Sequence, residues 1–558
     1  MIEIIAHNLA PIMFVSLIGF LLLGYPVAFS LAANGLLFFV IAVEMSPYSD
    51  EISLSWPLLQ TLPGRVLDVM RNDTLLAIPF FTFMGIILEK SGMAEDLLDT
   101  IGQLFGPIRG GLAYAAILVG ALLAATTGVV AASVIAMGLI SLPIMLRYGY
   151  DRPLATGVIA ASGTLAQVIP PSLVLIVLAD QLGRSVGDMY AGALIPGLLL
   201  TALYCAYVLA VSILQPKKVP ALPRTARTLN GSPLPLLLLL AVAAAIAMVV
   251  NWYLSSRLEN GAGIWASAIA VALAYAFASA DKVLKLGMLS TLTQRVVIVL
   301  VPPLALIFLV LGTIFLGIAT PTEAGAMGAT GALVMAFAKQ RLGFRLMSDA
   351  LEATTRLSCF VLFILIGSRI FSLTFYGING HVWVEELFLG IPGGILGFMV
   401  AVNILVFVLG CFIDFFEIAF IVIPLLAPVA AKLGIDLVWF GVILGVNLQT
   451  SFLTPPFGFA LFYMRSVAPA ADYIDRVTGA RIAGIRTTQI YRGAVAFILL
   501  QAIMIAITVS FPGIVIQESG PAVDPDTIEI EIPVIGAGED GGIGLPPPPD
   551  FSQPPEFD

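Results

Sequence analysis

Residues 162–172 read SGTLAQVIPPS, and residues 447–456 read NLQTSFLTPP. In both stretches, hydroxyl and amide side chains lead into a Pro-Pro pair within a long apolar segment. Proline removes an N–H donor and clashes with the preceding helical turn, so two prolines in a row predict a broken helix. We therefore expect both stretches to unwind.

The likeness between the two stretches extends outward. Residues 142–151 read LPIMLRYGYD, and residues 427–436 read APVAAKLGID. A Pro, a basic residue, a Gly and an Asp match at the spacing of 285 residues that also separates the Pro-Pro pairs. This indicates two related halves, approximately 10–215 and 295–511, joined by extra helices at 230–280. The alternative is chance recurrence in a chain with 52 Gly and 36 Pro.

The composition is that of a membrane protein. Hydrophobic residues make up 59% of the 558 residues, charged residues make up 11%, and the mean hydropathy is +1.03. Soluble proteins carry about 25% charged residues. Apolar stretches of about 17–25 residues, long enough to cross a bilayer, recur along the chain. The sequence predicts an all-α polytopic membrane protein, with a transmembrane permease region at 1–511.

Basic residues predict the orientation. They cluster at 147–152, 217–227, 282–295, 339–345 and 465–492. The positive-inside rule places these loops in the cytoplasm. The loop of Arg147 then lies inside and that of Lys432 outside, so the halves are inverted, as in many secondary transporters. Arg184 and Lys432 are lone basic residues in loops predicted to lie outside.

The C-terminal segment 512–558 has a different composition. It contains no Lys or Arg and ten Asp or Glu, and without these the net charge of −9 becomes +1. A segment rich in Pro, Gly and carboxylates buries too little apolar surface to fold, so we expect a disordered acidic tail. The isolated Cys205, Cys359 and Cys411 predict no disulfide, zinc or redox motif.

The two broken stretches are candidate ion sites. Unwound backbone at membrane depth is tolerated where protein or a water-filled cavity satisfies it. Hydroxyl, amide and carbonyl oxygens there are the neutral ligands that a partly dehydrated sodium ion needs. The alternative is a structural kink in which Ser and Thr bond back to the helix.

Another candidate re-entrant element precedes each broken stretch. Residues 124–133 read AATTGVVAAS, small residues that permit close backbone approach, and residues 411–417 read CFIDFFE. Segments 124–146 and 416–431 either cross the membrane or re-enter it. Residues 320–323, TPTE, join two apolar segments, and we expect them to form a structural turn and helix start.

Charges within apolar segments point to function, because a charge at the bilayer centre costs about 2.5–3.5 kcal/mol. Asp414 and Glu417 are three residues apart and share a helix face. Asp414 is a candidate to neutralise a bound cation. Arg369 is a candidate to bind a substrate carboxylate bidentately. It could instead pair with Asp414 or Glu417, or extend to the membrane surface.

At these residues the sequence resembles the large permease subunit of tripartite ATP-independent periplasmic (TRAP) transporters, the DctM type. The likeness spans roughly residues 10–510, and its motifs are Gly163–Ser172, Thr320–Ala324, Asp414 within Gly410–Glu417, and Thr454–Gly458. The resemblance implies an elevator-type fold of inverted repeats with two re-entrant hairpins, unwound helices and two sodium sites. It also implies a four-helix small membrane subunit (DctQ type) and a periplasmic solute-binding protein (DctP type).

The resemblance also implies site residues. Those carried over as sodium ligands are Thr127, Gly128, Ser162, Gly163 and Thr164 in the first half, and Asp414, Asn447, Gln449, Thr450 and Thr454 in the second. Arg369 and Gln167 are the candidate substrate ligands. The first hairpin of the family commonly reads S-G-S with an Asp shortly after. Here residues 127–129 read TGV, which weakens the first sodium site.

These features predict a multi-pass protein of the bacterial inner membrane that imports small organic acids, as carboxylates, by sodium-coupled alternating access. No cofactor besides the coupling ion and no nucleic acid are expected. The alternative within the class is an ion-coupled organic anion carrier without a binding protein. Outside the class of carriers, the alternative functions are those of a channel and of an intramembrane hydrolase. The chain has two histidines, His7 and His381, and no catalytic motif, so we expect no enzyme.

Overall fold

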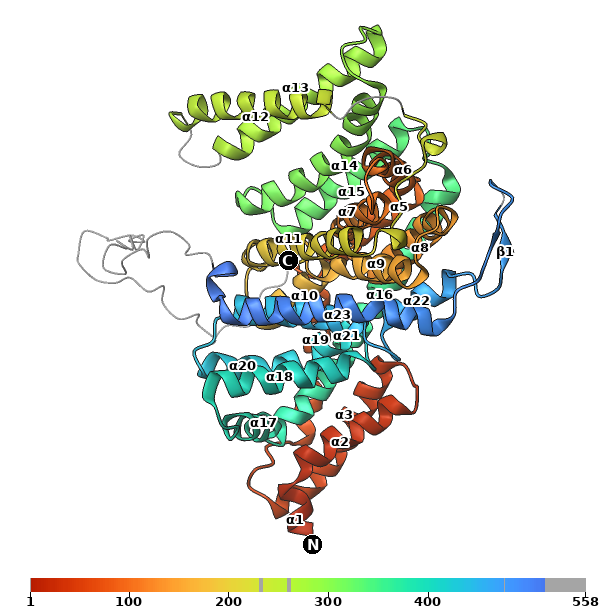
Figure 1. Cartoon of the computed structure of the whole chain (residues 1–558). Coiled ribbons are helices and arrows are strands. Elements are labelled where there is room, and N and C mark those ends of the chain that lie inside the picture. The colour runs from red at the N-terminus through yellow and green to blue at the C-terminus, as the bar shows by residue number, and fades with distance from the viewer. Residues whose placement is uncertain (1, 230–233, 258–261, 476, 517–558) are drawn as a thin grey trace, which may run out of the picture. The chain divides into compact units, whose positions relative to one another are not determined.

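The computed structural model describes residues 2–229, 234–257, 262–475 and 477–516, mostly as helices (Figure 1). The first helices are α1 (Ile2–His7), α2 (Leu9–Leu22), α3 (Val27–Met45), α4 (Leu62–Met70), α5 (Ala77–Lys90), α6 (Met93–Phe105), α7 (Gly111–Thr127), α8 (Val130–Arg147), α9 (Arg152–Thr164), α10 (Leu173–Leu182), α11 (Val186–Leu214) and α12 (Leu234–Ser255).

The chain continues through α13 (Ala262–Leu284), α14 (Thr291–Phe315), α15 (Pro321–Ala338), α16 (Phe344–Gly377), α17 (Gly380–Leu389), α18 (Gly394–Gly410), α19 (Phe415–Ile421), α20 (Ile423–Lys432), α21 (Leu437–Phe452), α22 (Phe459–Val467) and α23 (Thr487–Ser510). Short 3-10 helices are η1 (Ser46–Tyr48), η2 (Trp56–Thr61), η3 (Leu165–Gln167), η4 (Pro216–Lys218), η5 (Arg224–Ala226) and η6 (Pro512–Ile514). Two strands, β1 (Tyr473–Ile474) and β2 (Arg481–Ile482), pair antiparallel.

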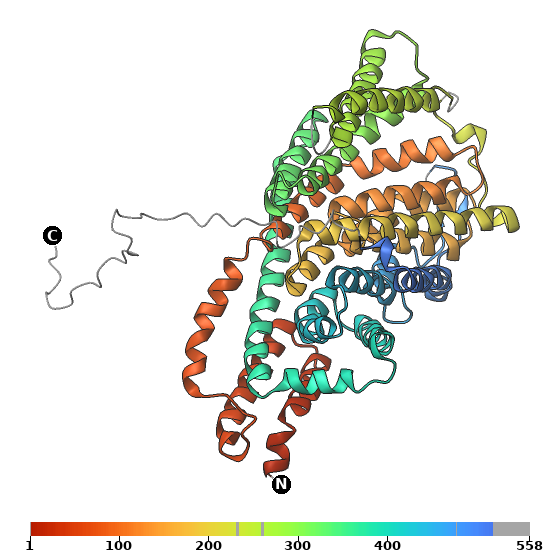
Figure 2. The same cartoon turned by 90° about the vertical axis from the view of Figure 1, so that its left-hand side faces the viewer.

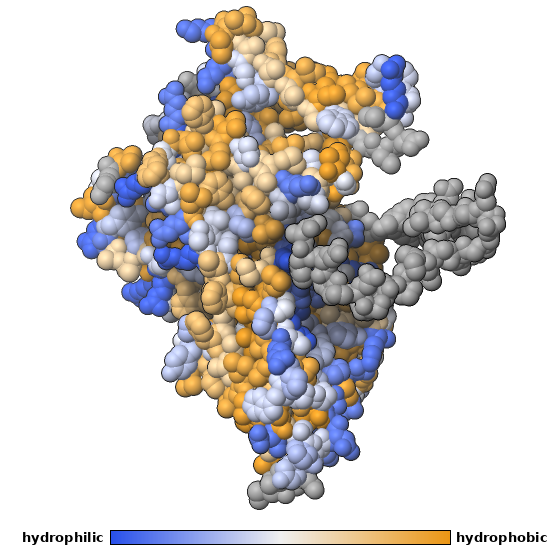
Figure 3. All heavy atoms as spheres, turned by 180° about the vertical axis from the view of Figure 1, so that it is seen from behind, coloured by the Kyte–Doolittle hydropathy of each residue, from blue (hydrophilic) through white to orange (hydrophobic). Residues whose placement is uncertain are grey.

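The helices have the length and composition of membrane spans. Within the described residues, 8 helices are long and apolar enough to cross a bilayer, and up to 11 spans result if each bent helix pair counts as one. Apolar side chains cover much of the face seen in Figure 3. Because only helices and closed barrels satisfy their backbone within lipid, this architecture fits a bilayer. The all-α polytopic prediction is confirmed.

Corresponding helices begin at matched positions. Asp151 caps α9 by accepting the Leu154 N–H, and Asp436 caps α21 by accepting the Trp439 N–H. The two capping residues are 285 residues apart, as the sequence comparison predicts. In the same way α3 packs along α16, seen side-on in Figure 2, while α15 packs along α5. The assignment of 10–215 and 295–511 as repeat halves, with 230–280 as a joint, stays a prediction.

The helix breaks lie later than the sequence predicts. Residues 162–164 are the last turn of α9, and residues 447–452 end α21, so the prediction that these residues are unwound is wrong. The irregular backbone comes at 168–172 and 453–458. A proline ring clashes with the carbonyl four residues before it, so Pro170 and Pro455 leave the earlier turns intact.

The candidate re-entrant segments are also broken helices. A break at 128–129 separates α7 from α8, and a break at 411–414 separates α18 from α19. Val129 and Asp414 are the N-caps that follow these breaks, and they too are 285 residues apart. Residues 130–147 form one helix, whereas α19 and α20 are bent by 52°.

The lone basic residue Lys432 has a structural explanation. Its Nζ contacts both carboxylate oxygens of Glu385 on α17, at 2.5 and 2.6 Å. The matched residue Arg147 pairs instead with Asp475 next to the β1–β2 hairpin. The acidic tail predicted at 512–558 lies outside the described residues from position 517 onward.

Candidate ion and substrate sites

The ends of α9 and α21 meet at one buried hydrogen-bond network. The Gln449 Nε2 donates to the Thr164 Oγ1 and to the Tyr204 hydroxyl, each at 3.2 Å. The same hydroxyl accepts from the Gln501 Nε2 at 2.8 Å. Thr164 and Gln449 are matched positions of the two halves, 285 residues apart. Equivalent residues therefore contact one another where the halves meet.

The first-half candidates surround the start of α8 closely. Gly128 has a φ of +60° and ends α7, and a Cβ there would lie 2.8 Å from the Leu173 Cγ. A Cβ on Gly163 would lie 2.4 Å from the Val134 Cγ2 and 3.0 Å from the Val134 backbone nitrogen. These glycines permit close approach of α7, α8, α9 and α10. The Thr127 side chain lies outside the described part of the structure.

The hydroxyl groups of the first half bond back to their own helix. The Ser162 Oγ donates to the Val158 carbonyl, and the Thr164 Oγ1 donates to the Ala161 carbonyl at 2.8 Å. Both side chains are fully buried. A hydroxyl that donates its proton keeps oxygen lone pairs, so these groups remain able to contact a cation. These hydrogen bonds are those expected of a structural kink, in which Ser and Thr hydroxyls bond back to their own helix.

In the second half the candidates lie around the break at 411–414. Asp414 caps α19, and its Oδ1 accepts the Phe415 N–H at 2.7 Å. Its own N–H donates to the Glu417 Oε2 at 3.1 Å, which completes a capping box. The end of α18 touches α21, because a Cβ on Gly410 would lie 2.2 Å from the Ser451 Oγ. The break that begins at Cys411 and ends at Asp414 therefore adjoins the last turn of α21.

The remaining second-half candidates line that last turn. The Asn447 Nδ2 donates to the Asn403 carbonyl of α18 at 2.7 Å. The Thr450 Oγ1 donates to the Val446 carbonyl, and the Thr454 Oγ1 donates to the Thr450 carbonyl. These are neutral oxygens, and Asp414 supplies a negative charge in the helix break that adjoins this turn at Ser451. This is a donor set suited to a small monovalent cation.

The two substrate candidates lie in different environments. Arg369 on α16 lines a cavity of about 530 Å³ together with Arg65 of α4. Across the same cavity stand Gln181 of α10, Phe420 of α19 and Pro424 of α20. The lining of this cavity does not include Gln167. Gln167 is fully buried, and within the described residues neither its Nε2 nor its Oε1 has a hydrogen-bond partner.

The alternative ion pair of Arg369 is not formed. Among the ion pairs of the described residues, none includes Arg369. Asp414 and Glu417 instead form the capping box at the start of α19, in which the Asp414 N–H donates to the Glu417 carboxylate. Arg369 is exposed to its cavity. Thr320 and Glu323 form a capping box at the start of α15, so the structural role predicted for residues 320–323 is confirmed.

Sequence reasoning missed several residues of these sites. Tyr204 and Gln501 complete the central network, and Arg65 stands beside Arg369. Gln501 was detectable, because it is an amide within the apolar segment of α23. Arg65 had no such signal, because it belongs to a mixed polar segment and joins Arg369 only in the folded chain.

Comparisons with known proteins identify the family of the chain. A family model described as "Tripartite ATP-independent periplasmic transporter, DctM component" matches residues 14–514. The chain belongs to this family. It is thus a multi-pass protein of the bacterial inner membrane, and its family is one of transporters and not of enzymes. The resemblance to TRAP large permeases is confirmed.

Three relatives have different substrates in their names. The C4-dicarboxylate TRAP transporter large permease protein DctM of Pseudomonas aeruginosa is 30% identical, over 73% of this chain and 81% of that protein. The isethionate TRAP transporter permease protein DctMQ of Oleidesulfovibrio alaskensis is 25% identical, over 82% of this chain and 61% of that protein. The sialic acid TRAP transporter permease protein SiaT of Haemophilus influenzae is 23% identical, over 88% and 65%.

Proposed function

We propose that this TRAP large permease imports a small organic acid, as a carboxylate, coupled to inward movement of sodium ions. The observation that carries the proposal is the carboxylate of Asp414 in the break between α18 and α19, a break that begins beside Ser451 in the last turn of α21. Buried carboxylates are costly unless a cation or hydrogen bonds compensate them. Bound sodium would supply that compensation, and no cofactor beyond the coupling ion is invoked.

The two sodium sites are proposed to be unequal. Val129 occupies the position in the first half that Asp414 occupies in the second. The first site would therefore rest on neutral oxygens from residues 127–128 and 162–164. Without a carboxylate at the matched position, it should bind sodium more weakly than the site at Asp414.

The substrate is proposed to bind in the cavity of Arg65 and Arg369. Two guanidinium groups in one cavity attract an anion, and each presents a planar fork that matches a carboxylate. The named substrates of the three relatives are also organic acids. Gln167 of η3, whose buried amide has no hydrogen-bond partner among the described residues, is a second candidate contact for the bound substrate.

The division of the cavity walls suggests how transport would proceed. Arg65 and Arg369 belong to α4 and α16, whereas Gln181, Phe420 and Pro424 belong to α10, α19 and α20. Movement of the second group of helices past the first would carry ion and substrate across, as in an elevator. A DctQ-type small membrane subunit would extend the fixed part, and a DctP-type binding protein would deliver the substrate.

The proposal is tested by uptake of a C4-dicarboxylate, sialic acid or isethionate into proteoliposomes. The protein tested is the full chain with its small subunit and binding protein. We expect Arg369→Gln and Arg65→Gln to raise KM roughly tenfold or more, because a hydrogen bond to a charged group contributes about 1.5–3 kcal/mol. The matched control is Arg184→Gln, an exposed arginine outside the cavity.

The outcomes separate the alternatives. Equal KM values for all three variants and wild type would contradict the assigned substrate cavity. Saturable uptake that needs no binding protein would favour the stand-alone organic anion carrier. Flux that does not saturate with substrate would favour a channel.

A further inference from the structure

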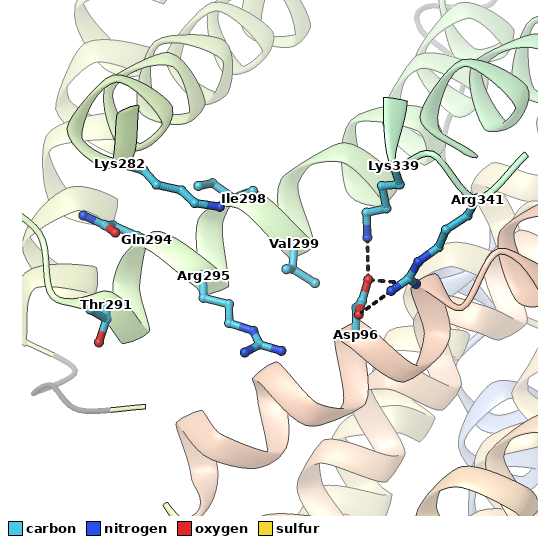
Figure 4. A pocket seen from close by; sticks show the side chains of 9 residues that line it. All are labelled: Asp96, Lys282, Thr291, Gln294, Arg295, Ile298, Val299, Lys339 and Arg341. Carbon is cyan, nitrogen blue, oxygen red and sulfur yellow. Dashed lines mark hydrogen bonds and ion pairs between the residues drawn. The ribbon is translucent and has the colours of Figure 1, made fainter. Parts of the chain in front are cut away.

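A basic cavity lies at the cytoplasmic ends of α13, α14 and α15. It has a volume of about 500 Å³, and its charged lining residues are Lys282, Arg295, Lys339, Arg341 and Asp96. Figure 4 shows these side chains converging from separate helices. The basic clusters at 282–295 and 339–345 are those that the positive-inside rule places in the cytoplasm. The cavity therefore faces the inner leaflet of the membrane.

The cavity keeps an excess of positive charge. Lys339 and Arg341 share one carboxylate, Asp96, at 2.8 and 3.2 Å, and Arg295 pairs with Asp99 at 2.8 Å. Among the ion pairs of the described residues, none includes Lys282, which is exposed at the end of α13. Four cations are thus set against three carboxylates, namely Asp96, Asp99 and the Asp281 that precedes Lys282. An anion entering the cavity would meet a net positive charge of one, together with the exposed Lys282 ammonium.

The turn between α13 and α14 fixes the positions of these cations. The buried Asp281 accepts the backbone N–H groups of Met288 and Leu289 at 3.0 and 2.9 Å. It also accepts the Gln294 Nε2 at 2.7 Å. Asp281 immediately precedes Lys282, and Gln294 immediately precedes Arg295. The basic side chains therefore project from a braced turn.

A separate apolar cavity lies further along the same helices. Its volume is about 780 Å³, and its walls are almost entirely apolar residues of α12, α13 and α14. On α14, Thr291, Arg295 and Ile298 of the basic cavity lie on one face with Pro302, Ala305 and Leu309 of the apolar cavity. Residues three or four apart share a helix face, so the two cavities follow one stripe.

The α13 residues that line the two cavities also share one face of that helix, so we call the stripe along α13 and α14 the groove. Ala268, Ala272 and Tyr275 line the apolar cavity, and Lys282 stands two turns further along the same face. The helix α12 that borders this groove has no buried residue in its apolar span within the described structure. The groove thus joins a cationic recess at the membrane surface to an apolar channel at membrane depth.

We propose that this groove binds an anionic phospholipid, with its phosphate among Lys282, Arg295, Lys339 and Arg341 and an acyl chain along α13 and α14. A basic recess on the cytoplasmic side of membrane helices matches an anionic headgroup. The apolar cavity along α13 and α14 suits a hydrocarbon chain, which a phospholipid has and a soluble phosphate lacks. The site is independent of the proposed transport function and lies outside the sodium and substrate residues.

Native mass spectrometry of the full chain, titrated with phosphatidylglycerol or phosphatidylethanolamine, tests the proposal. We expect the wild type to bind phosphatidylglycerol more tightly than phosphatidylethanolamine. The double variant Lys282→Gln, Arg295→Gln should weaken phosphatidylglycerol binding roughly thirtyfold, because each charge removed costs about fivefold in affinity. The matched control is Lys217→Gln, Arg224→Gln, which removes two exposed charges from another cytoplasmic loop. The single variant Lys282→Gln keeps the Arg295–Asp99 ion pair. It therefore still tests the site if the double variant does not fold, and we expect it to weaken phosphatidylglycerol binding about fivefold.

A second pair of variants tests the acyl channel. Ala272→Trp would fill the groove, whereas Leu273→Trp places the same ring on the neighbouring exposed position outside it. We expect only Ala272→Trp to weaken phosphatidylglycerol binding, and glycerol phosphate to compete poorly. Equal phosphatidylglycerol affinity in the pocket and control variants would overturn the proposal. Loss of the small subunit from Ala272→Trp, with unchanged lipid binding, would assign the groove to a protein helix instead.

Discussion

Asp414 is the one carboxylate among the predicted sodium ligands, and its matched position in the first half is Val129. Its backbone N–H and its side chain both take part in the start of α19. An ion bound at this residue would therefore order the break between α18 and α19. The sodium dependence of stability reports on this residue directly, because a ligand that binds the folded state stabilises it.

We expect sodium, compared with potassium, to raise the unfolding temperature of the wild type, and Asp414→Asn to weaken the apparent sodium affinity at least tenfold. The expected loss of sodium affinity reflects the removed negative charge, because Asp414→Asn changes no other side chain. Glu323→Gln is the control, since it alters the carboxylate of a comparable capping box outside the site. An unchanged sodium response in Asp414→Asn would remove Asp414 from the ion site. Fluorescence-monitored thermal unfolding in detergent measures both.

The Gln449 side chain joins the halves at Thr164 and Tyr204. Gln449→Leu would remove one buried hydrogen bond to each hydroxyl, while Tyr204 keeps its bond from Gln501, and a typical hydrogen bond contributes about 0.5–1.5 kcal/mol. We expect a lower unfolding temperature for Gln449→Leu than for Gln60→Leu, which changes an exposed glutamine of η2. Similar unfolding temperatures would show that the network contributes little to the contact between the halves.

At the scale of elements, the breaks depend on glycine. Gly128 and Gly183 have nearly the same positive φ, +60° and +62°, but different surroundings. A Cβ on Gly183 meets nothing within 4 Å, whereas one on Gly128 meets Leu173 at 2.8 Å. The left-handed conformation costs an L-residue about 1–2 kcal/mol, so Gly183→Ala should lower stability by about that much. Gly128→Ala should lose more, through the clash. Equal losses in thermal unfolding would mean that α7 and α10 are less closely packed than described.

The β1–β2 hairpin is tied to the α8–α9 turn by one ion pair. The Arg147 guanidinium bonds both carboxylate oxygens of Asp475 at 3.0–3.1 Å, and Thr478 bonds the same carboxylate. These hydrogen bonds lower the pKa of the Asp475 carboxyl to about 2. A lowered carboxyl pKa gives stability that is complete above the ordinary value of about 3.9. That stability is lost as the pH falls toward the folded-state value.

Asp475→Asn should therefore lower the unfolding temperature at pH 7. The difference from wild type should narrow below about pH 4, where the Asp475 carboxyl of the unfolded wild type takes up a proton while that of the folded protein stays ionised. Thermal unfolding between pH 3 and pH 7 measures this difference. Asp472→Asn, which breaks the exposed pair with Arg481, is the control and should show a smaller effect at pH 7. A difference for Asp475→Asn that does not change with pH would contradict the role of its charge.

The sequence patterns predicted where helices begin and break more accurately than they predicted which side chains contact one another. Residues 320–323 were expected to form a turn and a helix start, and α15 begins at Pro321 with Thr320 as its N-cap. The Pro-Pro pairs located both breaks, but polar residues before them suggested unwinding too early, because a proline disturbs only the preceding turn. The network of Tyr204, Gln449 and Gln501 joins residues up to 297 positions apart, and no local pattern records such a contact.

At the scale of the whole molecule, the repeated elements, the family and the membrane helices all indicate a transporter. We propose that ions bind at the ends of α9 and α21, and that the substrate binds in the cavity between α16 and α10. Lipid binding along α13 and α14 would lie apart from both. These assignments predict that mutations in one region change one measured property and leave the others in place.

The most direct test of sodium-coupled import is uptake of a carboxylate into proteoliposomes with the small subunit and the binding protein. We predict that uptake requires an inward sodium gradient, requires the binding protein, and is lost in Asp414→Asn but kept in Glu323→Gln. Uptake of the same size with potassium in place of sodium would contradict sodium coupling.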